Sequence, residues 1–227
     1  MNKNYANYLL NKITEDYNKI GDKYSSVREK DWKEMSFLFD EHLKEGDRVL
    51  DLGCGNGRFY PVFKEKKVDY VGVDSCYKLI NIAKEKYPEA RFETDSVFDL
   101  DYGDSFDKIF SIAVLHHIPS EDLRKEFLNI CFKFLKKEGT LILTVWNLEE
   151  KINKGFNLVS FLKGFKMDKR DIFIPWYGAK EVYFHCFTLE ELVQLISETG
   201  FEIIDKGEIL VGLKPYSNFY IVCKKYG

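Results

Sequence analysis

The segment Asp51-Leu52-Gly53-Cys54-Gly55-Asn56-Gly57 constrains the fold of this chain more than any other part of its 227 residues. It follows a short apolar run that is typical of a buried strand, and it precedes a stretch with helical character. Glycines at such a junction let the backbone take positive φ angles and approach a ligand closely. The start of the following helix then offers unpaired N–H groups to an anionic group. The spacing is G-x-G-x-G after an acid, which differs from the dinucleotide fingerprint G-x-G-x-x-G.

Acidic residues stand at the ends of two further predicted strands, at Asp74 and Asp95. Open α/β sheets bind ligands at the carboxyl ends of their parallel strands, so these acids are expected near the glycine-rich segment. Asp74 is suited to accept hydrogen bonds from both hydroxyls of a ribose. Asp95 is suited to accept one from an adenine amino group, with Ser96 and Val97 beside the ring. The alternative is that these residues only form turns, since aspartate and glycine favour turns in any protein.

Strand-like and helix-like segments alternate along the chain, which predicts an α/β fold with a parallel sheet covered by helices. Ser120 is expected to cap one helix that Gly139 ends, and Thr188 to Glu191 form a capping box for another that Gly200 closes. The predicted strands cover residues 48–52, 69–74, 90–95, 106–115, 140–146, 201–210 and 218–225. The predicted helices cover residues 5–20, 57–66, 77–87, 120–137 and 188–200.

The pattern VLDLGCGNG, followed by GVD and TD, resembles the class I methyltransferases over about residues 48–146. This resemblance implies a Rossmann-like fold with a mostly parallel seven-stranded sheet, helices on both faces, and S-adenosyl-L-methionine as the cofactor. The helix start would receive the methionine carboxylate, and Asp51 would hold the ammonium group or orient the loop. The cofactor-binding residues expected on this basis are Tyr24, Arg28, Asp51, Gly53, Cys54, Gly55, Asn56, Gly57, Asp74, Ser75, Asp95, Ser96, Val97 and Ala113.

Two histidines after the fourth predicted strand, and a tryptophan after the fifth, point to the acceptor side of the site. His116 and His117 are candidates for a general base or a substrate contact. The alternative is that one packs against the cofactor while the other bonds to the backbone. Trp146 would either line the acceptor site or belong to the hydrophobic core. We take His116, His117, Trp146 and Asn147 as candidate residues that position the acceptor.

A narrower resemblance covers nearly the whole chain, from about residue 17 to residue 225. The chain is similar to the tRNA wobble-uridine carboxymethyl methyltransferase family. The segments that carry the similarity are Tyr24-Ser25-Ser26-Val27-Arg28, SIAVLHH at 111–117, TVWNLEE at 144–150, Asp171-Ile172-Phe173-Ile174-Pro175-Trp176, and Tyr183-Phe184-His185 leading into the capping box.

Members of that family esterify the carboxylate of 5-carboxymethyluridine at the wobble position of tRNA, and some work with a small zinc-containing activating partner. A carboxylate is already ionised near neutral pH, so its methylation requires no strong base. The resemblance implies that Arg170, Trp176, Tyr183 and His185 contact the substrate. Val182 stands where the family has an arginine. Arg28, Lys180 and Arg170 are the candidates to replace that charge.

The charge of the chain leaves other functions open. The net charge of −3 counts mildly against RNA as a substrate, because proteins that bind nucleic acids are often basic. Residues 151–170 nevertheless carry six cations against one anion, which would attract phosphates or simply form a solvated loop. The acidic charge and an aromatic content of 16% also suit a small-molecule O- or C-methyltransferase. A non-catalytic module that binds S-adenosylmethionine is a third reading, which the intact loop and acids oppose.

Composition sets the remaining expectations. The chain has five cysteines, which is an odd number, and none of them forms a CxxC pair. This favours neither a disulfide framework nor a zinc site, so no metal is expected. The chain shows no signal-peptide pattern and no apolar run long enough for a bilayer, so no membrane association and a cytoplasmic location are expected. We expect a single domain over residues 1–227, with an N-terminal helical extension at 1–45. An insert with few regular signals, at 147–187, is expected over the acceptor site.

Overall fold

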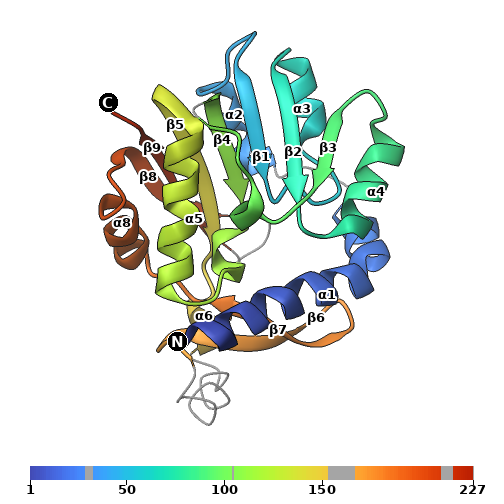
Figure 1. Cartoon of the computed structure of the whole chain (residues 1–227), viewed down its shortest axis with the longest axis vertical. Helices are drawn as coiled ribbons and strands as arrows, with labels where there is room; N and C mark the ends of the chain where they lie inside the picture. The colour runs from blue at the N-terminus through green and yellow to red at the C-terminus, as the bar shows by residue number, and fades with distance from the viewer. Residues whose placement is uncertain (29–32, 104, 153–166, 211–216, 227) are drawn as a thin grey trace.

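The computed structural model describes residues 1–28, 33–103, 105–152, 167–210 and 217–226 (Figure 1). Its centre is a seven-stranded sheet with the order β3-β2-β1-β4-β5-β9-β8. The first five strands pair in parallel, and β9 runs antiparallel to both β5 and β8. These strands are β1 (Arg48–Leu52), β2 (Asp69–Asp74), β3 (Arg91–Thr94), β4 (Phe106–Ile112), β5 (Leu135–Trp146), β8 (Glu202–Leu210) and β9 (Ser217–Lys224). The predicted fold class, a mostly parallel seven-stranded sheet, is confirmed.

Helices cover both faces of this sheet (Figure 1). The α-helices are α1 (Lys3–Val27), α2 (Ser36–Asp40), α3 (Tyr60–Glu65), α4 (Tyr77–Lys86), α5 (Glu121–Phe134), α6 (Glu149–Lys151) and α8 (Leu189–Ser197). Short 3-10 turns cover Lys33–Met35, Val97–Asp99 and Leu115–His117. Both predicted N-cap residues are confirmed: Ser120 Oγ accepts from the Leu123 N–H at 3.3 Å, and Thr188 Oγ1 accepts from the Glu191 N–H at 3.0 Å. The second half of the predicted capping box is replaced, because the Glu191 carboxylate lies 2.7 Å from His185 Nε2. No helix in the described part of the chain combines the length and apolar character that crossing a bilayer requires.

The central strands carry side chains that are buried on both faces. In β1, Leu50 belongs to a core that packs against α5 and α8, whereas its neighbour Val49 belongs to a second core with residues of α2 and α3. This explains why the strand reads as a continuous apolar run, as parallel strands between two helical layers do.

The end of α5 differs from the sequence prediction. The helix was expected to continue through Lys137 until Gly139, but it ends at Phe134, and β5 already begins at Leu135. Leu135 is fully buried and pairs with Phe106 of β4, so sheet pairing takes the residues that helical spacing had suggested for α5. The positive φ angle lies at Glu138 (66°) rather than at Gly139.

Residues 147–187 contain more regular structure than their sequence indicates. Strands β6 (Asp171–Trp176) and β7 (Ala179–His185) form an antiparallel hairpin that is a two-stranded sheet of its own. Tyr177 and Gly178 make the turn with φ angles of 46° and 109°. This is the positive-φ turn favoured in tight hairpins, but tyrosine replaces the usual asparagine or glycine at its first position. The turn was therefore hard to recognise, and the expected lack of regular structure is wrong here.

Helix α1 and the hairpin lie together beneath the carboxyl ends of the central strands (Figure 1). Leu9 of α1 packs with Phe173 and Tyr183 of the hairpin. At its other end α1 contacts α4, where Asn18 Oδ1 accepts from the backbone N–H of Lys78 at 3.2 Å. The helix is thus fixed to the hairpin on one side and to the sheet's helical layer on the other.

Candidate functional site

A cavity of about 820 Å³ lies between helix α1 and the carboxyl ends of β1, β2, β3 and β4. It brings together residues that are far apart in the sequence. Of the cofactor-binding residues expected from the sequence, those on its wall are Tyr24, Asp51, Gly53, Cys54, Gly55, Asn56, Asp74, Ser75, Asp95, Ser96, Val97 and Ala113. Gly57 and Arg28 do not line the cavity.

The glycine-rich loop has the backbone geometry that its sequence indicates. Gly53, Gly55 and Gly57 have φ angles of 77°, 56° and 71°. A Cβ atom on Gly53 would lie 2.2 Å from Cγ2 of Val114, well inside van der Waals contact. The N–H of Gly53 donates to the carbonyl of Val73 at 2.7 Å, which fixes the loop against β2. Only glycine satisfies both the conformation and the space at position 53.

Asp74 ends β2 with its carboxylate turned back toward the loop. Oδ2 accepts from the N–H of Gly55 at 2.9 Å, and Oδ1 accepts from the N–H of Cys76 at 2.8 Å. Burial raises the pKa of this carboxyl group, and the two backbone N–H groups partly offset the rise. A carboxylate offers about four acceptor positions, so two N–H bonds leave capacity for the hydroxyls of a ribose.

Asp51 is 2% exposed at the end of β1, and its Oδ2 accepts from the Tyr70 hydroxyl at 3.0 Å. Burial raises the pKa of Asp51 to about 7, against the lowering effect of the Tyr70 hydrogen bond, and nearby Asp74 raises it further. A buried carboxylate of this kind is stabilised by a cation beside it. The carboxylate acceptor at this end of the cavity therefore fits the ammonium group expected of S-adenosylmethionine.

The residues after β3 form a second polar corner of the cavity. Asp95 Oδ1 accepts from the N–H of Ser96 at 2.8 Å, and Ser96 Oγ accepts from the N–H of Phe98 at 3.3 Å. Val97 opens the 3-10 turn that follows. On the opposite wall Ala113, with φ of 62°, donates its N–H to the carbonyl of Thr144 at 3.0 Å. Asp95 and Ser96 would give a flat ring polar contacts at its edge, and Val97 would give it apolar cover.

Two cavity residues were missed in the sequence. Arg58 is 7% exposed, directly follows the loop, and has its guanidinium carbon 4.6 Å from the centre of the Phe59 ring. Burial lowers the pKa of Arg58, although the group stays charged. Its position after Gly57 was a usable signal. Tyr17 also lines the cavity, but it reaches the site from the middle of α1, where nothing in the sequence distinguishes it from a packing residue.

His117 lies on the cavity wall with both ring nitrogens engaged. Nδ1 lies 3.2 Å from the carbonyl oxygen of Tyr183, and Nε2 lies 2.9 Å from the Tyr17 hydroxyl. A carbonyl only accepts, so Nδ1 carries the proton and the neutral ring accepts from Tyr17 at Nε2. Burial lowers the pKa of His117 to about 4, and the bond to Tyr183 offsets only part of that effect. The ring is therefore neutral near pH 7.

His116 is fully buried and does not line the cavity. Its Nδ1 accepts from the backbone N–H of Trp146 at 3.2 Å. Burial lowers the pKa of His116 well below its ordinary value, and His117 lowers it further. Each histidine thus makes a hydrogen bond with the backbone, whereas the packing alternative expected such a bond for only one of them.

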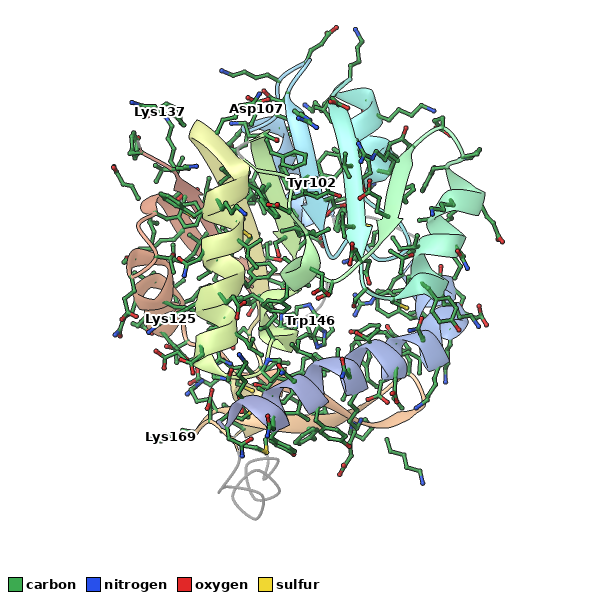
Figure 2. All side chains as sticks on the ribbon, in the orientation of Figure 1. Tyr102, Asp107, Lys125, Lys137, Trp146 and Lys169 are labelled. Atoms are coloured by element: carbon green, nitrogen blue, oxygen red, sulfur yellow. The ribbon has the colours of Figure 1, made fainter. Side chains whose placement is uncertain are left out.

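An aromatic cluster, made of His116, His117, Trp146, Trp176 and Phe184, adjoins the cavity at the end of β5. The Trp146 ring centre lies 4.9 Å from those of His116 and Trp176, and 5.4 Å from that of Phe184. Figure 2 marks Trp146 between the ends of the strands and α1. The cluster joins β5 to the hairpin, so the hairpin packs beside the cavity at the expected acceptor residues.

Arg28 lies over this aromatic cluster rather than in the cavity wall. Its guanidinium carbon is 5.7 Å from the ring centre of Trp146 and 5.8 Å from that of Trp176. Nε donates to the Tyr177 hydroxyl at 3.2 Å, and the Arg28 carbonyl accepts from Asn56 Nδ2 at 3.2 Å. The arginine therefore connects the glycine-rich loop with the turn of the hairpin.

Asn147 and Arg170, which were expected at the acceptor site, lie away from the cavity wall. Asn147 Nδ2 donates to Glu208 of β8 at 3.0 Å. Arg170 Nε donates to the Cys186 carbonyl at 2.5 Å. Both side chains hold neighbouring segments together, so this placement does not support a role in contacting the acceptor.

Tyr183 and His185 belong to a buried polar network behind the cluster. Asp171 Oδ1 accepts from the Tyr183 hydroxyl at 2.6 Å and lies 2.7 Å from His185 Nδ1. His185 Nε2 lies 2.7 Å from Glu191 at the start of α8. The two side chains are 1% and 2% exposed. Their expected substrate contact therefore stays a prediction, and the structure gives them a role in fixing the hairpin to α8.

Asp168, Asp171 and His185 bring possible metal-ligand atoms within 4.8 Å of one another. Asp168, however, already forms an ion pair with the buried Arg124 at 2.9 Å. Asp171 and His185 bond to each other. The two carboxylates are thus already paired with protein groups, Asp168 with Arg124 and Asp171 with His185.

The pKa of His117 predicts a measurable sensitivity to acid. The unfolded chain takes up a proton on this residue below about pH 6.5, whereas the folded protein takes it up only near pH 4, so stability falls between these values. We expect the unfolding free energy of the wild type to drop by up to about 3 kcal/mol more than that of His117→Gln over this range. Urea denaturation at several pH values checks this. The contribution of His116 is common to both proteins, and equal pH dependence would contradict the assignment.

A family model described as a methyltransferase domain matches residues 26–206. The tRNA (carboxymethyluridine(34)-5-O)-methyltransferase of Schizosaccharomyces pombe is 27% identical over 227 aligned residues, which cover 89% of this chain and 92% of that protein. The Arabidopsis thaliana protein of the same name is 34% identical over 136 residues, which cover 60% of this chain but only 32% of that protein.

Solved structures show the same fold. An S-adenosylmethionine-dependent methyltransferase of Methanosarcina mazei superposes with a TM-score of 0.73 at 24% identity, covering 83% of this chain and 97% of that one. A methyltransferase of Haloferax volcanii, solved in complex with the Trm112 methyltransferase activator, superposes with a TM-score of 0.69 at 15% identity. It covers 94% of this chain and 98% of that one.

Proposed function

The chain belongs to the methyltransferase domain family and is an S-adenosylmethionine-dependent enzyme, and from this premise we propose that it methylates the carboxylate of 5-carboxymethyluridine at the wobble position of tRNA. The proposal names both an acceptor chemistry, the formation of a methyl ester, and a macromolecular substrate. The observation that carries it is the state of His117 at the cavity wall.

An acceptor that had to lose a proton would need a base beside the transferred methyl group. His117 is poorly suited to this, because burial lowers its pKa to about 4 and both ring nitrogens are already engaged. His116 is fully buried, and burial lowers its pKa well below the ordinary value for histidine. A carboxylate arrives as an anion and needs no such base. The site then works mainly by placing the acceptor and excluding water.

Arg28 is the side chain best placed to bind the acceptor's carboxylate. Val182, which stands where the resembling family has arginine, is buried in the same apolar group as Trp146 and Trp176. The guanidinium of Arg28, which is distant from Val182 in the sequence, lies over the same two indole rings. We propose that Arg28 supplies the positive charge that Val182 lacks, with the indoles covering the pyrimidine.

The cofactor supplies an electrophilic methyl group on a sulfonium centre. The residues that line the cavity would hold it by its polar parts: Asp74 at the ribose, Asp51 at the ammonium group, and Asp95 at the adenine amino group. The loop at Gly53 to Gly57 would let the methionine end approach the backbone. Tyr17 and His117 border the route from this cavity to the aromatic cluster.

The similar proteins support the substrate class. The relatives from Schizosaccharomyces pombe and Arabidopsis thaliana are named for methylation at this uridine. We further propose a single domain and, by analogy with the Haloferax volcanii complex, a small activating protein as a partner. The cations Lys154, Lys163 and Lys166 of the basic segment lie outside the described residues.

The test is methyl transfer from labelled S-adenosylmethionine to tRNA that carries 5-carboxymethyluridine. We expect one methyl group per tRNA, found by mass spectrometry as the methyl ester of that nucleoside. The matched control is the same tRNA with the carboxylate replaced by its amide, which has nearly the same shape and should accept no methyl group. The assay is run with and without an added activating protein.

Transfer to both tRNAs, or to another position, would contradict the carboxylate as acceptor. Transfer to small carboxylates or phenols but not to tRNA would instead support a small-molecule methyltransferase. Binding of S-adenosylmethionine without turnover on any of these acceptors would support a non-catalytic module.

A further inference from the structure

A second hollow, of about 780 Å³, lies between the outer face of α1 and the hairpin β6–β7. We call it the α1–hairpin groove. The residues that line it are Lys12, Asp16, Lys19, Ile20, Lys23, Tyr177, Gly178, Ala179, Lys180 and Glu181. It shares no lining residue with the cofactor cavity. The sequence had pointed to residues 151–170 as a segment that would attract phosphates or simply form a solvated loop.

Four lysines and two acids, Asp16 and Glu181, line this groove, so its formal charge is positive. Lys12 is used internally: its Nζ bonds to Asp16 and donates to the Glu181 carbonyl at 2.6 Å, which ties α1 to β7. Lys23 and Lys180 are exposed, and neither ammonium group has an ion-pair partner among the described residues. Lys19, the remaining lysine of the groove, is also exposed.

Lys19 has a weak partner, Glu15, with 3.7 Å between Nζ and the carboxylate, and both side chains are 68% exposed. Such exposed pairs contribute little and exchange readily for a better ligand. Three ammonium groups on the rim are thus available to an anion, in a chain whose net charge is −3.

The inner end of the groove leads to the acceptor side. Tyr177 lines the groove, and its hydroxyl oxygen accepts from Arg28 Nε at 3.2 Å. Its ring lies edge-on to Tyr24 with 5.8 Å between ring centres. Tyr24 in turn lines the cofactor cavity. Tyr177 holds a φ of 46°, which is an unfavourable conformation for a bulky residue and is more common at functional sites. The turn of the hairpin therefore connects groove and cavity.

We infer that the α1–hairpin groove binds the phosphate backbone of the RNA substrate, with Lys19, Lys23 and Lys180 contacting successive phosphates. The target nucleotide would then turn at Tyr177 toward Arg28 and the aromatic cluster. Single-stranded RNA is commonly bound by such a combination of basic groove and stacking rings. This inference rests on the proposed function, since it takes RNA as the substrate.

The test compares two triple variants in binding a hairpin RNA that represents the anticodon arm with 5-carboxymethyluridine. Lys19→Ala/Lys23→Ala/Lys180→Ala removes the groove cations. The control, Lys84→Ala/Lys137→Ala/Lys206→Ala, removes three exposed lysines that do not line the groove. Figure 2 marks Lys137 at the end of the molecule opposite α1. Binding of S-adenosylmethionine, measured by calorimetry, should be the same in all three proteins and reports correct folding.

We expect the groove variant to bind the RNA roughly tenfold to hundredfold more weakly, and the slope of log K against log salt concentration to become shallower by about 2. The control should change little in either quantity. Equal losses of RNA affinity in the two variants, or no loss in the groove variant, would overturn the inference. The proposed function would still hold if the wild type transferred a methyl group to tRNA. Absence of both RNA binding and transfer in the wild type would overturn the inference and the proposed function together.

Discussion

Asp74→Ala should weaken the binding of S-adenosylmethionine by at least about a hundredfold. The change removes the proposed acceptor of both ribose hydroxyls, and hydrogen bonds to a charged group are worth about 1.5–3 kcal/mol each. It also leaves the N–H groups of Gly55 and Cys76, now bonded at 2.9 and 2.8 Å, without their partner. Isothermal titration calorimetry with S-adenosylmethionine measures the effect.

The matched control for this change is Asp99→Ala. Asp99 is exposed and also lines the cavity, so its removal takes away the same negative charge near a cationic ligand. Its side chain makes no hydrogen bond to another described residue. We expect less than about a threefold loss of affinity, since solvent and salt largely screen the interaction of an exposed charge with the cofactor. Similar losses in both variants would show that Asp74 acts only through its charge.

Gly53→Ala should destabilise the fold by about 2–5 kcal/mol and abolish binding of the cofactor. Two costs add: a positive φ costs a non-glycine residue about 1–2 kcal/mol, and overpacking costs about 1–3 kcal/mol. At this position φ is 77°, and the new Cβ would lie 2.2 Å from Cγ2 of Val114. Urea denaturation gives the stability, and calorimetry gives the affinity.

Gly46→Ala separates the two costs. Gly46 has a φ of 85° but nothing within 4 Å of an added Cβ, so only the conformational cost applies. We expect about 1–2 kcal/mol from this variant. Adding Val114→Ala to Gly53→Ala should recover part of the loss, because the clashing methyl groups are removed. If the two glycine variants were equally destabilised, close packing at position 53 would not be the reason for its glycine.

The lining of the proposed cofactor cavity could be predicted from the sequence because its residues follow strands directly. Gly53, Asp74 and Asp95 each stand at or just after the carboxyl end of a short apolar strand, and parallel pairing of β1, β2 and β3 brings those ends together. Local sequence therefore determined both the element and the place of the residue within it. The same holds for the caps at Ser120 and Thr188, which act on amide groups three residues away.

The acceptor side could not be predicted in this way, because its contacts join segments far apart in the sequence. Tyr17 meets His117 across a hundred positions, and Arg28 meets Tyr177 across 149. Tyr183 and His185 were expected at the substrate because of the motif that contains them, yet they bond to Asp171 and Glu191. A motif gives the residue types of a segment, whereas the direction of each side chain depends on packing between elements.

The hairpin was missed for a related reason. Ile172, Phe173 and Ile174 are all buried, so β6 lacks the alternation of polar and apolar residues that marks a strand with one solvent face. The early end of α5 reflects the same competition between local and long-range preferences. Leu135 suits either a helix or a strand, and its pairing with Phe106 decides between them.

The separate sheet formed by β6 and β7 has a consequence for how such an enzyme can change. Ladder bonds join the hairpin strands to each other, while the strands that carry the proposed cofactor-binding residues belong to the central sheet. Side-chain packing at Trp146 and Arg28 connects the two. If the hairpin contacts the acceptor as proposed, we expect substitutions in it to alter the accepted substrate without disturbing the backbone of the proposed cofactor site. The molecule is modular in this respect, and grafting another hairpin at the same place is a rational way to redesign its specificity.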